Sequence, residues 1–301
     1  VPSVSGEALL NTVPELKTLA QLTVETLGLL PGASLDFEYL LSVLCWANFQ
    51  INQGAAGVII VQGTDTLEES ATFFDYLWEH DEPLVLTGAM RSAAQAGADG
   101  PANLLDAGRV ALAQSSRGRG AQVVIHGQIH RANAVRKVDS MALHAFASPV
   151  TGPAGVLMED VVRYLLPPVA RQVLPLPQNT NQAIALLEAS LSADSLLLEN
   201  VVELGYDGLV IAGFGAGHVS AHWAKVIETI ARHIPVIIAT RTGCGSTARS
   251  TYGFEGSEID LQRKGALMAG FTCPRKARIL LWLLVGCRQQ EHLASYLDQT
   301  G

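Results

Sequence analysis

The chain has 301 residues, of which 49% are hydrophobic and 16% are charged. This balance excludes a disordered protein, and the length favours two domains, each with its own core. The net charge of −8 argues against nucleic-acid binding, which needs a basic surface. The longest apolar run, residues 279–285, is too short to cross a membrane and predicts a buried element. No signal peptide is visible within the 301 residues, an absence that means little if residues precede Val1. We expect a cytoplasmic protein, with a periplasmic one as the alternative.

The first strand–turn–helix unit is predicted at residues 57–80. Residues 57–62 (GVIIVQ) are aliphatic and β-branched, as in a parallel strand buried on both faces. Residues 67–80 have apolar side chains at helical spacing. Thr66 and Glu69 have the spacing of a capping box, so we expect Thr66 to cap this helix.

The same alternation continues along the first half of the chain. Strands are predicted at residues 83–87 and 121–126, with a helix at residues 102–114 between them. Strands that alternate with helices over short connections indicate βαβ units with right-handed crossovers. A mostly parallel sheet flanked by helices is therefore expected.

A proline-rich stretch, residues 167–181, cannot sustain a helix or a central strand, and we interpret it as a linker. Beyond it, strands are predicted at residues 183–187, 208–212 and 236–240, and helices at residues 195–204 and 221–233. The predicted fold is α/β, with a larger N-terminal domain (residues 1–170) and a smaller C-terminal α/β domain (residues 181–301).

Candidate chemistry lies where the predicted strands end, because ligands bind beyond the carboxyl ends of parallel strands. Gly63, Thr64 and Asp65 follow the first strand, residues 88–91 follow the second, and Lys137 lies in the segment after the third. A hydroxyl, a carboxylate and a lysine suggest acyl transfer, since an ammonium group makes a hydroxyl easier to deprotonate.

Each of these residues also has a simpler explanation. Thr64 could be a helix cap, Asp65 would be favoured by the helix dipole, and Lys137 could be a solvated surface lysine. Longer sequence blocks favour the catalytic interpretation. Together they resemble the bacterial L-asparaginase and glutaminase-asparaginase family, in the same order along nearly the whole chain: residues 61–71 (VQGTDTLEESA), 88–91 (GAMR), 99–104 (DGPANL), 132–137 (ANAVRK) and 276–278 (KAR).

This resemblance implies hydrolysis of the side-chain amide of L-asparagine to L-aspartate and ammonia through a threonine acyl-enzyme. Thr64 would orient or activate water, Lys137 would ease deprotonation of the hydroxyl, and Asp65 would hold Lys137 and the substrate ammonium. Gly63 and Ala89 would contact the reacting amide through their backbones. It implies no metal or organic cofactor, and a homotetramer built as a dimer of dimers.

The chain departs from the family pattern in three places. The motif Thr-Gly-Gly-Thr-Ile, whose first threonine is the family's usual nucleophile, is absent from the 301 residues. We expect it, with a flexible loop, ahead of Val1; the alternative is a shortened, inactive chain. Either Gly32 or Ser34 takes the place of the serine that contacts the substrate carboxylate. Ala216 replaces an asparagine of glutamine-accepting relatives, which favours asparagine as the substrate.

Other functions fit the sequence less well. Residues 213–217 (GFGAG) resemble a dinucleotide-binding turn, but His218 stands in place of the third glycine. His126 and His130 lack the intervening glutamate of a helical zinc motif. A non-catalytic homologue that binds asparagine or glutamine, and a family member that prefers glutamine, stay open. Release of ammonia separates a binding protein from an enzyme.

Overall fold

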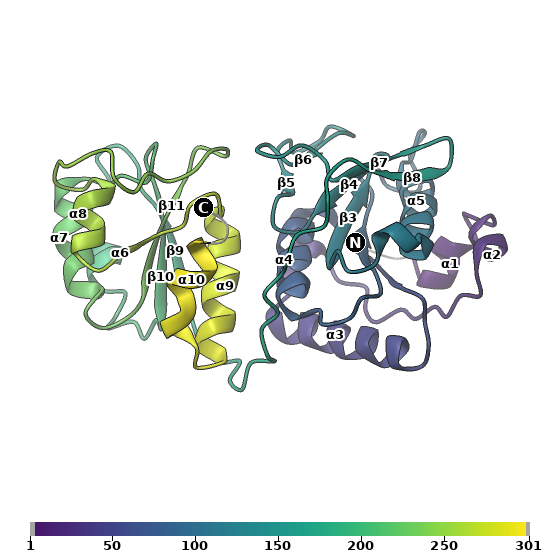
Figure 1. Cartoon of the computed structure of the whole chain (residues 1–301), viewed down its shortest axis with the longest axis horizontal. Coiled ribbons are helices and arrows are strands. Elements are labelled where there is room, and N and C mark those ends of the chain that lie inside the picture. Colours follow the sequence, from purple (N-terminus) through teal and green to yellow (C-terminus); the bar gives the residue numbers. More distant parts are fainter. Residues whose placement is uncertain (1–3, 299–301) are drawn as a thin grey trace. The chain divides into compact units, whose positions relative to one another are not determined.

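The computed structural model describes residues 4–298, and the chain divides into two compact units, Val1–Val173 and Leu174–Gly301. The boundary falls inside the proline-rich stretch, residues 167–181, which contains no helix or strand. Each unit has its own sheet with helices packed on it (Figure 1). The predicted two-domain α/β architecture is confirmed.

The first unit is built on a six-stranded sheet of order β1-β2-β3-β4-β7-β8. The first three strands are parallel, and their positions agree with the prediction within one residue at each end. β4, β7 and β8 are antiparallel and were not predicted. The bounds are β1 Val58–Val61, β2 Leu84–Thr87, β3 Ala121–Ile125, β4 Gln128–Arg131, β7 Gly155–Met158 and β8 Val161–Tyr164.

The direction of the chain reverses after β3 at a two-residue turn. His126 and Gly127 both have positive φ angles, 52° and 70°. Two successive residues in this region form the tight turn whose twist matches a β-hairpin. The backbone N–H of His126 also donates to the side chain of Asn103, at 2.8 Å, which ties the turn to the rest of the unit.

Helices cover both faces of this sheet, and Figure 1 shows α4 and α5 on opposite sides of it. α5 (Gly100–Leu112) buries Ala107, Val110 and Ala111 against Val85 and Val124 of the strands. α3 (Phe37–Asn52) packs on α4 (Leu67–Leu77). Two short helices, α1 (Gly6–Leu10) and α2 (Leu16–Leu19), precede α3 in the chain. A separate two-stranded sheet is formed by β5 (Arg136–Lys137) and β6 (Phe146–Ala147).

Two local predictions are wrong. Thr66 stands at the N-cap of α4, but its side chain makes no capping bond; its hydroxyl donates to the carbonyl of Gly32 at 2.8 Å. That bond joins two loops, and it displaces the expected capping box. β1 was predicted to be buried on both faces, whereas it is an edge strand among the described residues and Val61 is 45% exposed.

The second unit contains a four-stranded parallel sheet of order β12-β11-β10-β9. The predicted strands are confirmed as β9 (Ile184–Glu188), β10 (Gly208–Gly213) and β11 (Val236–Thr240), joined by β12 (Leu267–Met268). Its helices are α6 (Leu196–Glu199), α7 (Ala221–Ile230), α8 (Glu258–Arg263), α9 (Pro274–Gly286) and α10 (Leu293–Asp298).

Within this unit α6 is shorter than predicted, because residues 201–205 continue as turns that end at Gly205, where φ is +82°. The apolar run of residues 279–285 lies in α9 and is buried or half-buried, as predicted. Among the described residues, no helix has the length and apolar character needed to span a membrane.

Candidate active site

The structure brings Thr64, Asp65 and Lys137 together. The ammonium Nζ of Lys137 donates to Thr64 Oγ1 at 3.0 Å and to Asp65 Oδ1 at 2.9 Å. Thr64 and Asp65 lie in a single 3₁₀ turn directly after β1, and Lys137 lies in β5. Thr64 is buried and the side chain of Asp65 is 67% exposed, so one cation bridges a sheltered hydroxyl and a carboxylate that faces solvent.

Glycines at three loops allow the backbones around Thr64 to approach closely. A Cβ atom on Gly88 would lie 2.5 Å from the carbonyl oxygen of Gln62. A Cβ atom on Gly32 would lie 3.0 Å from the carbonyl oxygen of Gly63. Side chains at these positions would force the strand ends apart, so the close approach explains the residue type at both. Gly32, Gly63, Thr64 and Gly88 therefore meet at one end of the sheet.

The loop after β2 is fixed by two polar side chains. Asp99 accepts the backbone N–H groups of Met90 and Arg91, at 3.0 and 2.9 Å. Asn103 is 2% exposed and donates to the carbonyl of Gly88 at 2.9 Å. A buried amide with partners on both its oxygen and its nitrogen holds backbone in one position. The backbone of Ala89 is thereby fixed between two anchored residues.

Glu68 is a site residue for which the sequence suggested no role. Its carboxylate, 2% exposed, accepts the backbone N–H of Lys137. The hydroxyl of Thr72, one helical turn further along α4, lies 3.1 Å from the carbonyl of Ala132. Both ends of the segment that carries the lysine are therefore attached to α4. A signal was present in the sequence, since Glu68 shares the apolar face of the helix with Ala71, and a carboxylate there needs a partner.

The other predicted binding residues occupy different environments. Gly32 is buried against Gly63, whereas Ser34 and Ala89 are exposed. Both Gly32 and Ser34 belong to one short 3₁₀ turn beside Thr64. The structure therefore keeps both alternatives within the site's first loop. Among residues 4–298, no group of three or more histidine, cysteine, aspartate or glutamate side chains is arranged to hold a metal ion.

The sequence matches two family descriptions, "Asparaginase, N-terminal" over residues 1–170 and "Glutaminase/Asparaginase C-terminal domain" over residues 183–294. The chain belongs to the asparaginase family. Members similar to it include the probable periplasmic L-asparaginase of Haemophilus influenzae, 32% identical, with 93% of this chain and 80% of that protein covered. L-asparaginase 2 of Escherichia coli is 29% identical, with 94% and 81% covered.

A solved structure of the same family supports the fold. The crystal structure of the probable cytoplasmic L-asparaginase from Campylobacter jejuni matches with a TM-score of 0.89 and 26% identity, covering 99% of this chain and 91% of that one. The segment after β10 differs from a dinucleotide-binding turn. Residues 213–218 form a turn closed by bonds between Phe214 and His218, both 2.8 Å long, and no helix begins there as a dinucleotide site would need.

Proposed function

We propose that this member of the asparaginase family hydrolyses the side-chain amide of L-asparagine to L-aspartate and ammonia through a threonine acyl-enzyme. The observation that carries the proposal is the ammonium of Lys137, which contacts Thr64 Oγ1 and Asp65 Oδ1 at once, at 3.0 and 2.9 Å. A hydroxyl next to an ammonium group is easier to deprotonate, because the positive charge stabilises the oxyanion that forms.

The proposal gives each group one role. By the family resemblance, the covalent nucleophile is the first threonine of a Thr-Gly-Gly-Thr-Ile motif, which the 301 residues do not contain. Thr64 orients and activates the water that attacks the acyl-enzyme. Lys137 supplies the positive charge that stabilises the deprotonated hydroxyl of Thr64 during this step. One carboxylate oxygen of Asp65 accepts a hydrogen bond from the ammonium of Lys137 and holds it in place.

The same end of the sheet suits a zwitterionic amino acid. The largely exposed carboxylate of Asp65 can accept the α-ammonium of the substrate. The turn that contains Gly32 and Ser34 would receive the α-carboxylate, and the backbone carbonyl of Ala89 would accept the side-chain amide. We propose asparagine over glutamine because Ala216 lacks the amide of the glutamine-accepting pattern.

For the assembly we propose a homotetramer made of two dimers, as the resemblance implies. Analytical ultracentrifugation of the purified protein tests this, and a single monomeric species would contradict it. The cellular compartment stays a prediction, because one similar protein is named periplasmic and another cytoplasmic.

The test of the activity is ammonia release by the natural protein, purified as its own cell makes it. We expect release from L-asparagine, less from L-glutamine and least from the D-forms, together with L-aspartate in equal amount. Thr64→Val should lower kcat by two or more orders of magnitude with little change in the melting temperature. A protein that L-aspartate stabilises but that releases no ammonia would be a binding protein and would refute the proposal.

A further inference from the structure

The backbone of Lys137 lies at the outer edge of a two-stranded sheet. Lys137 is opposite Phe146 in the pairing of β5 with β6. The next pair along, Val138 and Ala145, is joined by a backbone hydrogen bond of 2.7 Å. Bonded and non-bonded pairs alternate in an antiparallel ladder, so Lys137 belongs to a non-bonded pair and its N–H points away from β6. That N–H therefore needs an acceptor on another element.

The acceptor is the carboxylate of Glu68, in the first turn of α4. This side chain is buried, and a buried carboxylate is tolerated only where it has hydrogen-bond partners. α4 begins at Leu67, directly after the turn that contains Thr64 and Asp65. The helix that follows the hydroxyl and the carboxylate of the site thus also holds the main chain of the lysine.

Two carboxylates act on different parts of Lys137. Asp65 accepts the Nζ ammonium at 2.9 Å and is the charged partner of the side chain. Glu68, three positions further along, accepts the main-chain N–H, which carries no net charge. A neutral amide oxygen can accept such an N–H in the same geometry, whereas a carboxylate on a shorter side chain stops short of it. The two carboxylates can therefore be tested separately.

We propose that Glu68 is a positioning residue for the reaction, and that it sets how far the ammonium of Lys137 reaches toward Thr64 by the place of its oxygen atom and not by its negative charge. The inference rests on the proposed function, in which Thr64 and Lys137 act during catalysis. The distance from Nζ to Oγ1 is 3.0 Å, and a displacement of about 1 Å in a catalytic contact can lower a rate about 10²-fold. Other groups hold the substrate, so loss of the bond to Glu68 affects kcat much more than KM.

Three substitutions of Glu68 in the natural protein separate position from charge. Glu68→Gln keeps an oxygen at the same reach and removes the charge. Glu68→Asp keeps the charge and withdraws the oxygen by one methylene group. Glu68→Ala removes both. Each variant is assayed for ammonia release from L-asparagine, for melting temperature, and for hydrogen exchange of the Lys137 amide, resolved by electron-transfer fragmentation in a mass spectrometer.

We expect Glu68→Gln to keep at least a third of kcat and the slow exchange of the Lys137 amide. Glu68→Asp and Glu68→Ala should lower kcat at least tenfold, with KM changed less than threefold, and should speed that exchange at least tenfold. If Glu68→Ala does not fold, the comparison of Glu68→Gln with Glu68→Asp still decides between position and charge.

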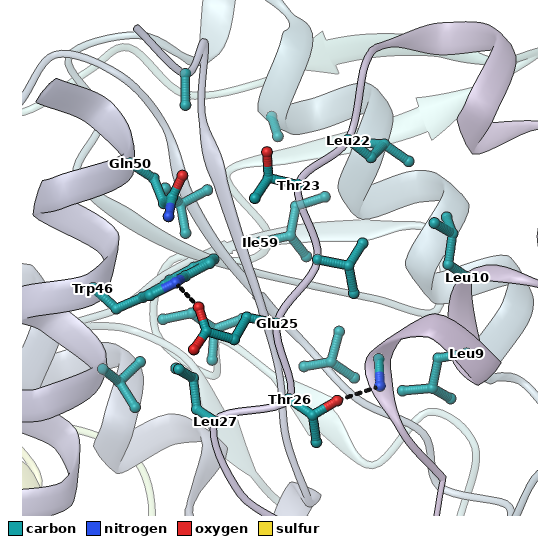
Figure 2. A pocket seen from close by; sticks show the side chains of 18 of the residues that line it. Leu9, Leu10, Leu22, Thr23, Glu25, Thr26, Leu27, Trp46, Gln50 and Ile59 are labelled. Atoms are coloured by element: carbon teal, nitrogen blue, oxygen red, sulfur yellow. Dashed lines mark hydrogen bonds between the residues drawn. The ribbon is translucent and has the colours of Figure 1, made fainter. Parts of the chain in front are cut away.

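Glu25 provides the matched control in the same unit. Its carboxylate lines the pocket in Figure 2 and accepts the indole N–H of Trp46 in α3, at 2.5 Å. This bond leads to α3 and not to the segment that carries Lys137. Glu25→Asp shortens the side chain in the same way and should keep kcat within twofold of the wild-type value.

Two results would overturn the proposal. Wild-type kcat in Glu68→Asp would show that the bond does not position the lysine. Equal loss of kcat in Glu68→Gln and Glu68→Asp would show that the charge matters and not the place of the oxygen. If the natural protein itself releases no ammonia, the proposed function fails; the exchange measurement then decides alone, and slow exchange of the Lys137 amide in Glu68→Asp would overturn the positioning role.

Discussion

Replacement of Lys137 by methionine separates the catalytic role of its ammonium group from its role in folding. The substitution removes the Nζ contacts with Thr64 and Asp65, at 3.0 and 2.9 Å. It keeps an unbranched apolar chain of similar length. The backbone N–H of residue 137 still bonds to Glu68, so the strand that carries it stays attached to α4.

The structure predicts two effects of different size. The side chain of Asp65 is 67% exposed, and an ion pair with such a partner contributes only about 0–1 kcal/mol to folding. The bond to Thr64 adds roughly 1 kcal/mol. A donor aimed at charge that develops during the reaction contributes about 3–4 kcal/mol, which corresponds to a 10²–10³-fold effect on kcat. Lys137→Met should therefore nearly abolish turnover and destabilise the fold by less than about 2 kcal/mol.

The assay is ammonia release under saturating L-asparagine, with urea unfolding of the same preparation. Lys17→Met is the matched control, since it removes an exposed lysine of the same unit that bonds to Asn11. It should keep full kcat. Wild-type kcat in Lys137→Met would remove the ammonium from the mechanism. If Lys137→Met lowered the free energy of unfolding by several kcal/mol, the contacts among Thr64, Asp65 and Lys137 would mainly stabilise the fold.

Three further substitutions test other parts of the structure. Gly88→Ala should destabilise the first unit by about 1–3 kcal/mol in calorimetry, because its Cβ would lie 2.5 Å from the Gln62 carbonyl; an unchanged melting temperature would contradict that contact. Asn103→Ala should cost about 1–3 kcal/mol and lower kcat/KM, since it leaves the buried carbonyl of Gly88 and the N–H of His126 without these bonds; thermal unfolding and kinetics check both. Burial raises the pKa of Glu258, but bonds from three backbone N–H groups and from His218 outweigh burial and hold the pKa below its usual value. Stability should therefore be complete above the unfolded pKa of about 4.3 and fall as the pH drops below it, and Glu258→Gln should flatten this acid limb in urea titrations.

The parallel strands could be predicted because their sequences are short aliphatic runs between helices with clear periodicity. The antiparallel half of the first sheet could not. β8, with the sequence VVRY, is only four residues long and half exposed, so its pattern differs little from that of a loop. The turn after β3 depends on His126 in a positive-φ conformation, which histidine adopts less readily than asparagine or glycine.

The candidate site was predicted from the resemblance, and the local sequence around each residue would not have been enough. Lys137 is 73 positions away from Thr64, and no periodicity relates two residues so far apart. The local sequence gives no role to Glu68, whose neighbour Glu69 fits a capping box that the structure does not contain. Local rules favoured the capping interaction; the tertiary contact of Thr66 with Gly32 replaced it.

The contacts of α4 explain how residues so distant in sequence can form one site. Thr64 and Asp65 occupy the turn that leads directly into this helix. Glu68, in its first turn, holds the backbone of Lys137, and Thr72 contacts the carbonyl of Ala132 at the other end of the lysine segment. The hydroxyl, the carboxylate and the ammonium are thus all positioned from one buried helix. A displacement of that helix would carry all three together, and their mutual distances would change less than their distances to a substrate held by other loops.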